Sequence, residues 1–169
     1  MDERSALIEP HIPSLRRYAR GLLRDASSGD DLLQDCLERA LRNWSARRPE
    51  GDLRAWLFAI MHNLFVSGAR LRGRRGPTAS LGDLPEEPPI RPTQEDRMLH
   101  DSVLDQLQKL SPEHRAVLLL IGVEELSYRQ AAEALGVPVG TVMSRLSRAR
   151  EHFRQALRDP PPLRLRTVK

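Results

Sequence analysis

The sequence is poor in cysteine, in lysine and in long apolar runs. Cys36 is the only cysteine, and Lys109 and Lys169 are the only lysines. A single cysteine excludes an intrachain disulfide and a cysteine-based metal cluster within one chain. No apolar stretch approaches the roughly 20 residues of a spanning helix, and the opening MDERSALIEP has no apolar signal-peptide core. We therefore expect a cytoplasmic protein without membrane insertion.

The scarcity of lysine makes the positive charge almost entirely arginine. The chain has 27 basic and 23 acidic residues, a net charge of +4 and a pI near 9.9. Arginine makes two-pronged contacts with phosphate and guanine, so this bias favours a nucleic-acid partner. A GC-rich genome would also replace lysine by arginine, and composition alone leaves both interpretations open.

The chain is punctuated near its middle. Residues 73–96, GRRGPTASLGDLPEEPPIRPTQED, are dense in proline and glycine and lack helical periodicity, as in a linker. Neither flank alternates as strands do, so the fold class we expect is all-α, with two small helical domains. The expected division is a first domain over 1–74, a flexible linker over 75–97, a second domain over 98–158 and a loose tail over 159–169.

Capping residues and prolines predict where the helices begin and break. Prolines 10 and 13 should interrupt the first helix, the run Ser27–Asp30 supplies N-cap residues for the second, and Ser111 followed by Pro112 starts another. The expected helices cover about 5–24, 30–44, 53–71, 93–110 and 112 onward, followed by two helices within 127–151.

The last two helices form a predicted helix-turn-helix. The stretch SYRQAAEALGVPVGTVMSRLSRARE breaks at Gly136, which can take the positive φ of a tight turn, and a basic helix is expected to restart at Gly140–Thr141. In that helix an apolar stripe opposes a polar face of hydroxyls and arginines, as required for entry into a major groove. A packed helical hairpin with a solvated basic face is the alternative. The stripe is Val142, Leu146, Ala149 and Phe153; the polar face is Thr141, Ser144, Ser147, Arg148 and Glu151, with Arg145 on the flank.

Two other helices carry unusual faces. The helix after residue 30 has an acidic side, which would repel nucleic acid and suit a basic protein partner, although such faces are often merely solvated. The helix from residue 53 has an inner stripe of Leu53, Trp56, Leu57, Ile60 and Leu64. Its other side is nearly uncharged, which suggests a docking surface or a flipped-base site, or else packing against the first helix. That side is Ala55, Ala59, His62 and Val66.

Three segments in this order resemble the extracytoplasmic-function sigma factors, the minimal two-domain members of the sigma-seventy family. They are GDDLLQDCLERAL, LRAWLFAIMHNL and LSYRQAAEALGVPVGTVMSRLSRARE. The resemblance covers almost the whole chain. It implies three partners: core RNA polymerase, bound through the clamp helices of its largest subunit and the flap region, promoter DNA, and an anti-sigma factor.

The resemblance also implies roles for particular residues. In the family, a base of the −10 element is flipped into a pocket, here between Asn63 and the loop 47–52. Core-polymerase binding is expected of Asp31, Gln34, Asp35 and Glu38; −10 DNA binding of Arg54, His62, Asn63 and Arg70; and −35 DNA binding of Tyr128, Arg129, Thr141, Ser144, Arg145 and Arg148.

Three departures from the family pattern stand out. Ser67 replaces a common aspartate, Ala131 a common isoleucine, and Met143 a common basic residue, which puts one phosphate contact in doubt.

The sequence thus predicts a sigma factor that directs promoter recognition, −10 melting and initiation. We expect no enzymatic activity, cofactor or metal, because the histidines are scattered and no phosphate-binding glycine loop is present. An autonomous helix-turn-helix regulator, or a sigma mimic that sequesters an antagonist, are the rival interpretations.

Overall fold

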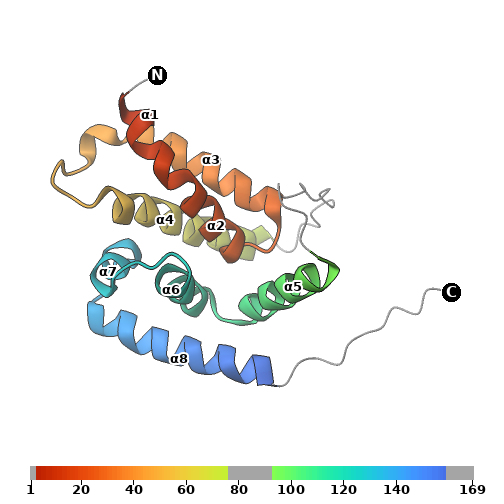
Figure 1. Cartoon of the computed structure of the whole chain (residues 1–169). Helices are drawn as coiled ribbons and strands as arrows, with labels where there is room; N and C mark the ends of the chain where they lie inside the picture. The colour runs from red at the N-terminus through yellow and green to blue at the C-terminus, as the bar shows by residue number, and fades with distance from the viewer. Residues whose placement is uncertain (1–2, 76–92, 159–169) are drawn as a thin grey trace.

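The computed structural model describes residues 3–75 and 93–158, and most of these residues lie in helices (Figure 1). Among these residues there is no strand, and the all-α prediction is confirmed. We call α1–α4 the N-terminal body and α5–α8 the C-terminal body. The elements are α1 (Glu3–Ile8), a 3₁₀ turn (Glu9–His11), α2 (Ile12–Leu22), α3 (Ala26–Arg42), a second 3₁₀ turn (Trp44–Ala46), α4 (Leu53–Arg75), α5 (Gln94–Lys109), α6 (Pro112–Gly122), α7 (Tyr128–Leu135) and α8 (Val139–Arg158).

Local sequence signals account for most helix boundaries. The first helix is interrupted where Pro10 and Pro13 were expected to interrupt it, by the 3₁₀ turn between α1 and α2. Ser111 caps α6 by accepting a bond from the His114 amide, with Pro112 at the first position. The structure begins α5 at Gln94, after a capping box of Thr93 and Asp96. Residues 76–92, most of the expected linker, and the tail 159–169 lie outside the described residues.

The predicted cap of α3 is wrong by a few residues. Asp25, not the run Ser27–Asp30, is the N-cap, and its carboxylate accepts a 3.0 Å bond from the Ser28 amide. An aspartate here also places a negative charge at the positive end of the helix dipole, so it competes well with the serines that follow. The buried side of α3 was predicted correctly and contains Leu32, Leu33, Cys36 and Ala40. The Cys36 thiol donates to the Leu57 carbonyl of α4, 3.6 Å away.

The faces of α4 differ from the prediction. Of the expected inner stripe only Leu57 is fully buried, and Phe58, Met61 and Phe65 are buried instead, against α2. Ala55, expected on an open face, is also fully buried. The helix is covered on two sides because the C-terminal body lies against it, with α7 packed along α4 (Figure 1). A helix that is buried on two sides has no single apolar stripe. For this reason the spacing of apolar residues did not predict which side chains of α4 are buried.

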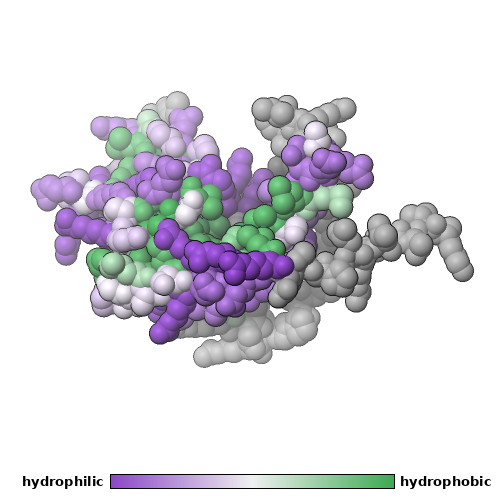
Figure 2. All heavy atoms as spheres, turned by 60° about the horizontal axis from the view of Figure 1, so that its bottom comes forward, coloured by the Kyte–Doolittle hydropathy of each residue, from purple (hydrophilic) through white to green (hydrophobic). Residues whose placement is uncertain are grey.

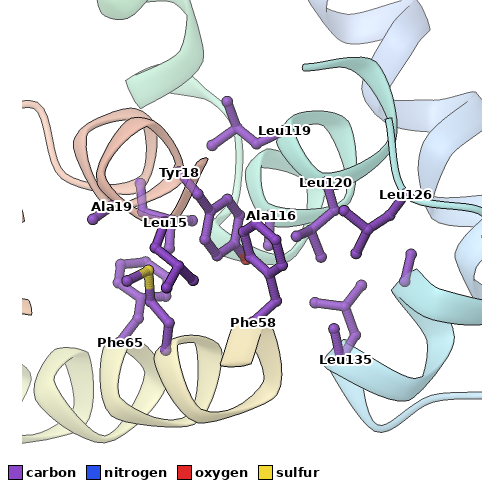
Figure 3. Packing of buried hydrophobic residues seen from close by; sticks show 14 of the residues in the cluster. Leu15, Tyr18, Ala19, Phe58, Phe65, Ala116, Leu119, Leu120, Leu126 and Leu135 are labelled. Carbon is purple, nitrogen blue, oxygen red and sulfur yellow. The ribbon is translucent and has the colours of Figure 1, made fainter. Parts of the chain in front are cut away.

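One hydrophobic cluster runs through both bodies. Tyr18 of α2 meets Phe58 of α4 edge to face, with ring centroids 5.2 Å apart. Figure 3 shows these rings next to leucines of α6 and α7, so the N-terminal core continues into the C-terminal body. The labelled residues of that cluster are Leu15, Tyr18, Ala19, Phe58, Phe65, Ala116, Leu119, Leu120, Leu126 and Leu135.

The two bodies are also in close contact where α2 meets α6. A Cβ atom placed on Gly21 would lie 2.8 Å from both terminal carbons of Leu119. A larger residue at this position would therefore require the Leu119 side chain, or the helix that carries it, to shift. No helix of the described part of the chain is long and apolar enough to cross a membrane.

Candidate nucleic-acid and partner interfaces

The acidic residues expected on the outside of α3 do lie there. Asp31, Gln34, Asp35 and Glu38 are all exposed, and the Gln34 amide donates to the Glu38 carboxylate at 3.2 Å. The neighbouring Asp30 differs, because it faces α2 and pairs with Arg20 at 3.1 Å. The face of α3 opposite the core therefore presents carboxylates to solvent.

The residues expected to bind the −10 element do not share one open surface. Asn63 is exposed, whereas His62 is half-buried beneath α2, with its Nδ1 3.5 Å from the Tyr18 hydroxyl. Burial, together with the nearby charge of Arg145, lowers the pKa of His62 to about 4, so this side chain is neutral at physiological pH. Arg70 is in α4, but its side chain is not among those that the structure describes.

The side chain of Arg47 stabilises the loop 47–52, to which it belongs. The Arg47 guanidinium lies over the Trp44 ring, 5.0 Å from its centroid, and donates to backbone carbonyls of the loop. Trp44 in turn meets Trp56 of α4 edge to face at 6.1 Å. Asn63, the other expected wall of a base pocket, lies about 15 Å along the helix axis from Leu53, where α4 begins. Asn63 is therefore about three helical turns from the residue at which the loop joins α4.

The helix-turn-helix has the expected geometry. Ser127 and Gln130 form a capping box at the start of α7, and Gly136 ends that helix in the left-handed conformation, with φ 65°. The new helix starts at Val139, one residue before Gly140. Its predicted apolar stripe faces α6 and α7, with Val142, Leu146 and Ala149 buried and Phe153 half-buried.

The outward side of α8 divides into two flanks. One lies toward Tyr128 and lines a shallow hollow of about 450 Å³. The other lies toward the start of α6, where Arg145 approaches Glu113 at 3.9 Å and His152 meets His114. Ser144 and Arg148 are exposed between the flanks, and Figure 2 shows hydrophilic side chains beside hydrophobic patches on this side of the molecule. The hollow is lined by Tyr128, Met143, Leu146, Ser147, Arg150, Glu151 and Arg154.

The residues expected to bind the −35 element lie on both helices of the helix-turn-helix, α7 and α8. Tyr128 and Arg129 are exposed at the first turn of α7, whereas Arg145 is half-buried on the far flank. Thr141 is half-buried at the first turn of α8. Ser147, which was expected on the polar face of α8, lies on the Tyr128 side together with Arg150, which the sequence did not single out. A helical-wheel comparison with Tyr128 as the reference would have found Arg150.

A buried carboxylate joins the two bodies. Glu124, in the turn between α6 and α7, accepts bonds of 2.8 and 2.7 Å from Nε and Nη2 of Arg17. Arg54, one of the expected −10 residues, donates to the Glu124 carbonyl at 2.5 Å. Beside them Gln130 donates to Asp52 at 2.5 Å. Arg54 is thus engaged by the other body rather than free.

The described residues form an all-helical protein with an exposed acidic surface on α3 and a helix-turn-helix made of α7 and α8. Residues 8–62 match the family described as the sigma-2 domain of PhyR, and residues 100–153 match region 4 of the sigma-70 family. The chain is 39% identical over 139 residues to the ECF RNA polymerase sigma factor EcfG of Rhodopseudomonas palustris, covering 82% of this chain and 76% of that protein. It is 35% identical to the sigma factor SigE of Mycolicibacterium smegmatis, covering 89% of this chain and 60% of that one.

A solved structure agrees with these relatives. The Bartonella quintana sigma factor RpoE, solved in complex with the anti-sigma factor NepR, superposes with a TM-score of 0.76 at 29% identity, covering 93% of this chain and 98% of that chain. The chain belongs to the extracytoplasmic-function sigma factors of RNA polymerase.

Proposed function

We propose that the exposed carboxylates of α3 bind the clamp helices of core RNA polymerase while α4 and α8 bind the −10 and −35 elements of a promoter. The observation that carries this proposal is the opposite charge of two exposed surfaces in one chain. Asp31 and Asp35 are exposed on α3, and Ser144 and Arg148 are exposed on α8. A protein that bridges a polypeptide and a DNA duplex needs both surfaces at once.

The chain contributes binding energy and the polymerase performs the chemistry. Arginine and hydroxyl contacts position the duplex, and trapping an unstacked base offsets the few kcal/mol needed to open a base step. The chain itself needs no catalytic group for this role. It works in the cytoplasm, where core polymerase and promoter DNA are found.

We further propose control by an anti-sigma factor. The Bartonella relative was solved with such a partner, and a protein that covers α3 and α4 would block polymerase and DNA together. The exposed apolar side chains of Met98 and Leu99 on α5 and Leu157 on α8 offer further contact area.

Run-off transcription with purified core polymerase across a promoter library tests the proposal. The chain should select a distinct class of promoters and reveal both elements and their spacing. Tight binding to one DNA site without any change in the promoters that core transcribes would instead identify an autonomous regulator.

A sigma mimic is the second candidate, because the N-terminal family is defined on PhyR. A mimic that sequesters an antagonist keeps its activity when Arg145 and Arg148 are both changed to alanine. A promoter-binding factor loses about 1 to 3 kcal/mol for each good base contact.

A further inference from the structure

Two arginines of the N-terminal body converge on one carboxylate of the C-terminal body. Arg17 of α2 forms a two-pronged pair with Glu124, and Nη2 of Arg54 lies 4.0 Å from the same carboxylate. The Glu124 side chain is completely buried, whereas 54% of the Arg17 side chain and 30% of the Arg54 side chain stay exposed. The cations therefore lie at the rim, and the acid fills the space between them.

The turn that carries Glu124 is shaped to present it. Glu124 and Leu126 donate backbone bonds of 2.9 Å to Leu119 and Leu120, which fold the turn back on α6. Glu125 has a φ of 55°, a region that residues other than glycine rarely adopt. A buried carboxylate without cationic partners is strongly disfavoured. The turn therefore depends on the two arginines of the other body.

The same two cations suit a phosphate group. A guanidinium binds carboxylate and phosphate oxygens with the same two-pronged geometry. Arg54 is in the first turn of α4, the helix expected to bind the −10 element, and Arg17 was not singled out by the sequence. We propose that Arg17 and Arg54 form a binding site for a DNA phosphodiester and that Glu124 occupies this site as an internal competitor. This inference rests on the proposed function for the role of α4.

The competition would make the closed chain a poor DNA binder. While Glu124 is in place, α7 also packs along α4, on which Ala55 is buried and His62 half-buried. Promoter DNA can reach the arginines only after the turn between α6 and α7 has moved away. Because the two occupants exclude each other, whatever separates the bodies raises the affinity for DNA.

The test measures binding of a fluorescein-labelled single strand of about 20 nucleotides of mixed sequence, by anisotropy with the full chain and no polymerase. Glu124→Gln removes the competing charge, and we expect binding about five to tenfold tighter than wild type. The slope of log K against log salt should steepen by about 0.7, because the site takes up one new phosphate of the single strand.

Two further variants complete the experiment. Asp105→Asn is the matched control, because it makes the same charge change in an exposed pair between the bodies, Asp105 with Arg24; it should stay within about twofold of wild type. Gly21→Leu inserts a side chain against Leu119 and should open the bodies, seen as a larger radius of gyration in X-ray scattering. Gly21→Leu should bind the single strand about five to tenfold more tightly than wild type although Glu124 is intact. It therefore tests the proposal even if Glu124→Gln fails to fold.

The proposal is overturned if Glu124→Gln, correctly folded, binds no more tightly than wild type. It is also overturned if the gain persists in the triple variant Arg17→Gln, Arg54→Gln, Glu124→Gln. Both results are independent of polymerase. A failure of the proposed function would appear instead as a wild-type chain that selects no promoter in the run-off assay.

Discussion

The guanidinium of Arg115 in α6 donates a 2.7 Å hydrogen bond to the carbonyl of Leu22, the last residue of α2. It also donates to the carbonyls of Leu107, Gln108 and Leu110 at 2.9 to 3.0 Å. These acceptors lie at the C-terminal ends of two helices, where the helix dipole is negative. Although burial lowers the pKa of Arg115, several carbonyl dipoles stabilise its charge in place of a carboxylate.

Replacing Arg115 by methionine should lower the free energy of unfolding by about 2 to 4 kcal/mol, because each buried carbonyl left without a donor costs about 1 to 3 kcal/mol. Urea denaturation followed by circular dichroism measures the loss. Arg24→Met is the control: Arg24 pairs with Asp105 in an exposed setting, and its loss should cost less than about 1 kcal/mol. Equal losses in the two variants would contradict the structural role of Arg115.

Stability should depend on pH through His62. Burial lowers its pKa to about 4 in the folded chain, against about 6.5 in the unfolded chain. Between these values the unfolded state binds the extra proton, so stability falls as pH decreases from about 6.5 to 4, by up to about 1.4 kcal/mol per pH unit. His62→Gln should flatten this slope in urea titrations at several pH values. The exposed His100 is the control, and His100→Gln should leave the slope unchanged.

Charge on α3 should set the affinity for polymerase. The double variant Asp31→Asn, Asp35→Asn should bind core polymerase about tenfold more weakly, since close charge pairs at an interface contribute directly to affinity. Asp30→Asn is the matched control, because Asp30 is on the same helix and already pairs with Arg16 and Arg20. Anisotropy with labelled chain measures both. Undiminished binding by the double variant would rule out this surface as the polymerase contact.

Arg148 and Arg145 should differ in their effect on −35 binding. Arg148 is exposed between the flanks of α8, whereas Arg145 lies against Glu113. Arg148→Ala should lose about 1 to 3 kcal/mol of duplex binding and relax the preference for one base, and Arg145→Ala should lose less. Gel-shift titration against the selected promoter and its single-base variants separates them. The reverse order would mean that α8 enters the groove on its α6 side.

The turn of the helix-turn-helix should tolerate only certain residues. Gly136 has a φ of 65° and no heavy atom within 4 Å of a would-be Cβ, so a side chain there meets backbone strain and no clash. Gly136→Ala should cost about 1 kcal/mol, and Gly136→Asn should cost less, because asparagine tolerates this conformation. Thermal unfolding followed by circular dichroism checks the expected order of stability, with wild type first, Gly136→Asn second and Gly136→Ala last.

Sequence reasoning succeeded where the signal is local and failed where it depends on the other body. The stripe of α8, the cap at Ser111 and the turn at Gly136 each depend on neighbours within a few residues, and all three were predicted correctly. The faces of α4 were not, because α7, which begins more than seventy residues after the start of α4, packs along it. Glu124 and Arg115 gave no pattern at all, since their partners are side chains and carbonyls from distant helices.

The position of Cys36 has a practical consequence. Its thiol lies between α3 and α4, and burial raises its pKa to about 12, so it is a poor nucleophile while these helices stay packed. Because it is the only thiol, a thiol-reactive dye should label the chain at the rate at which the N-terminal body unfolds. The rate of labelling should not change when the two bodies separate, because Cys36 stays buried within the N-terminal body. Labelling of this natural cysteine therefore distinguishes unfolding of that body from separation of the two bodies.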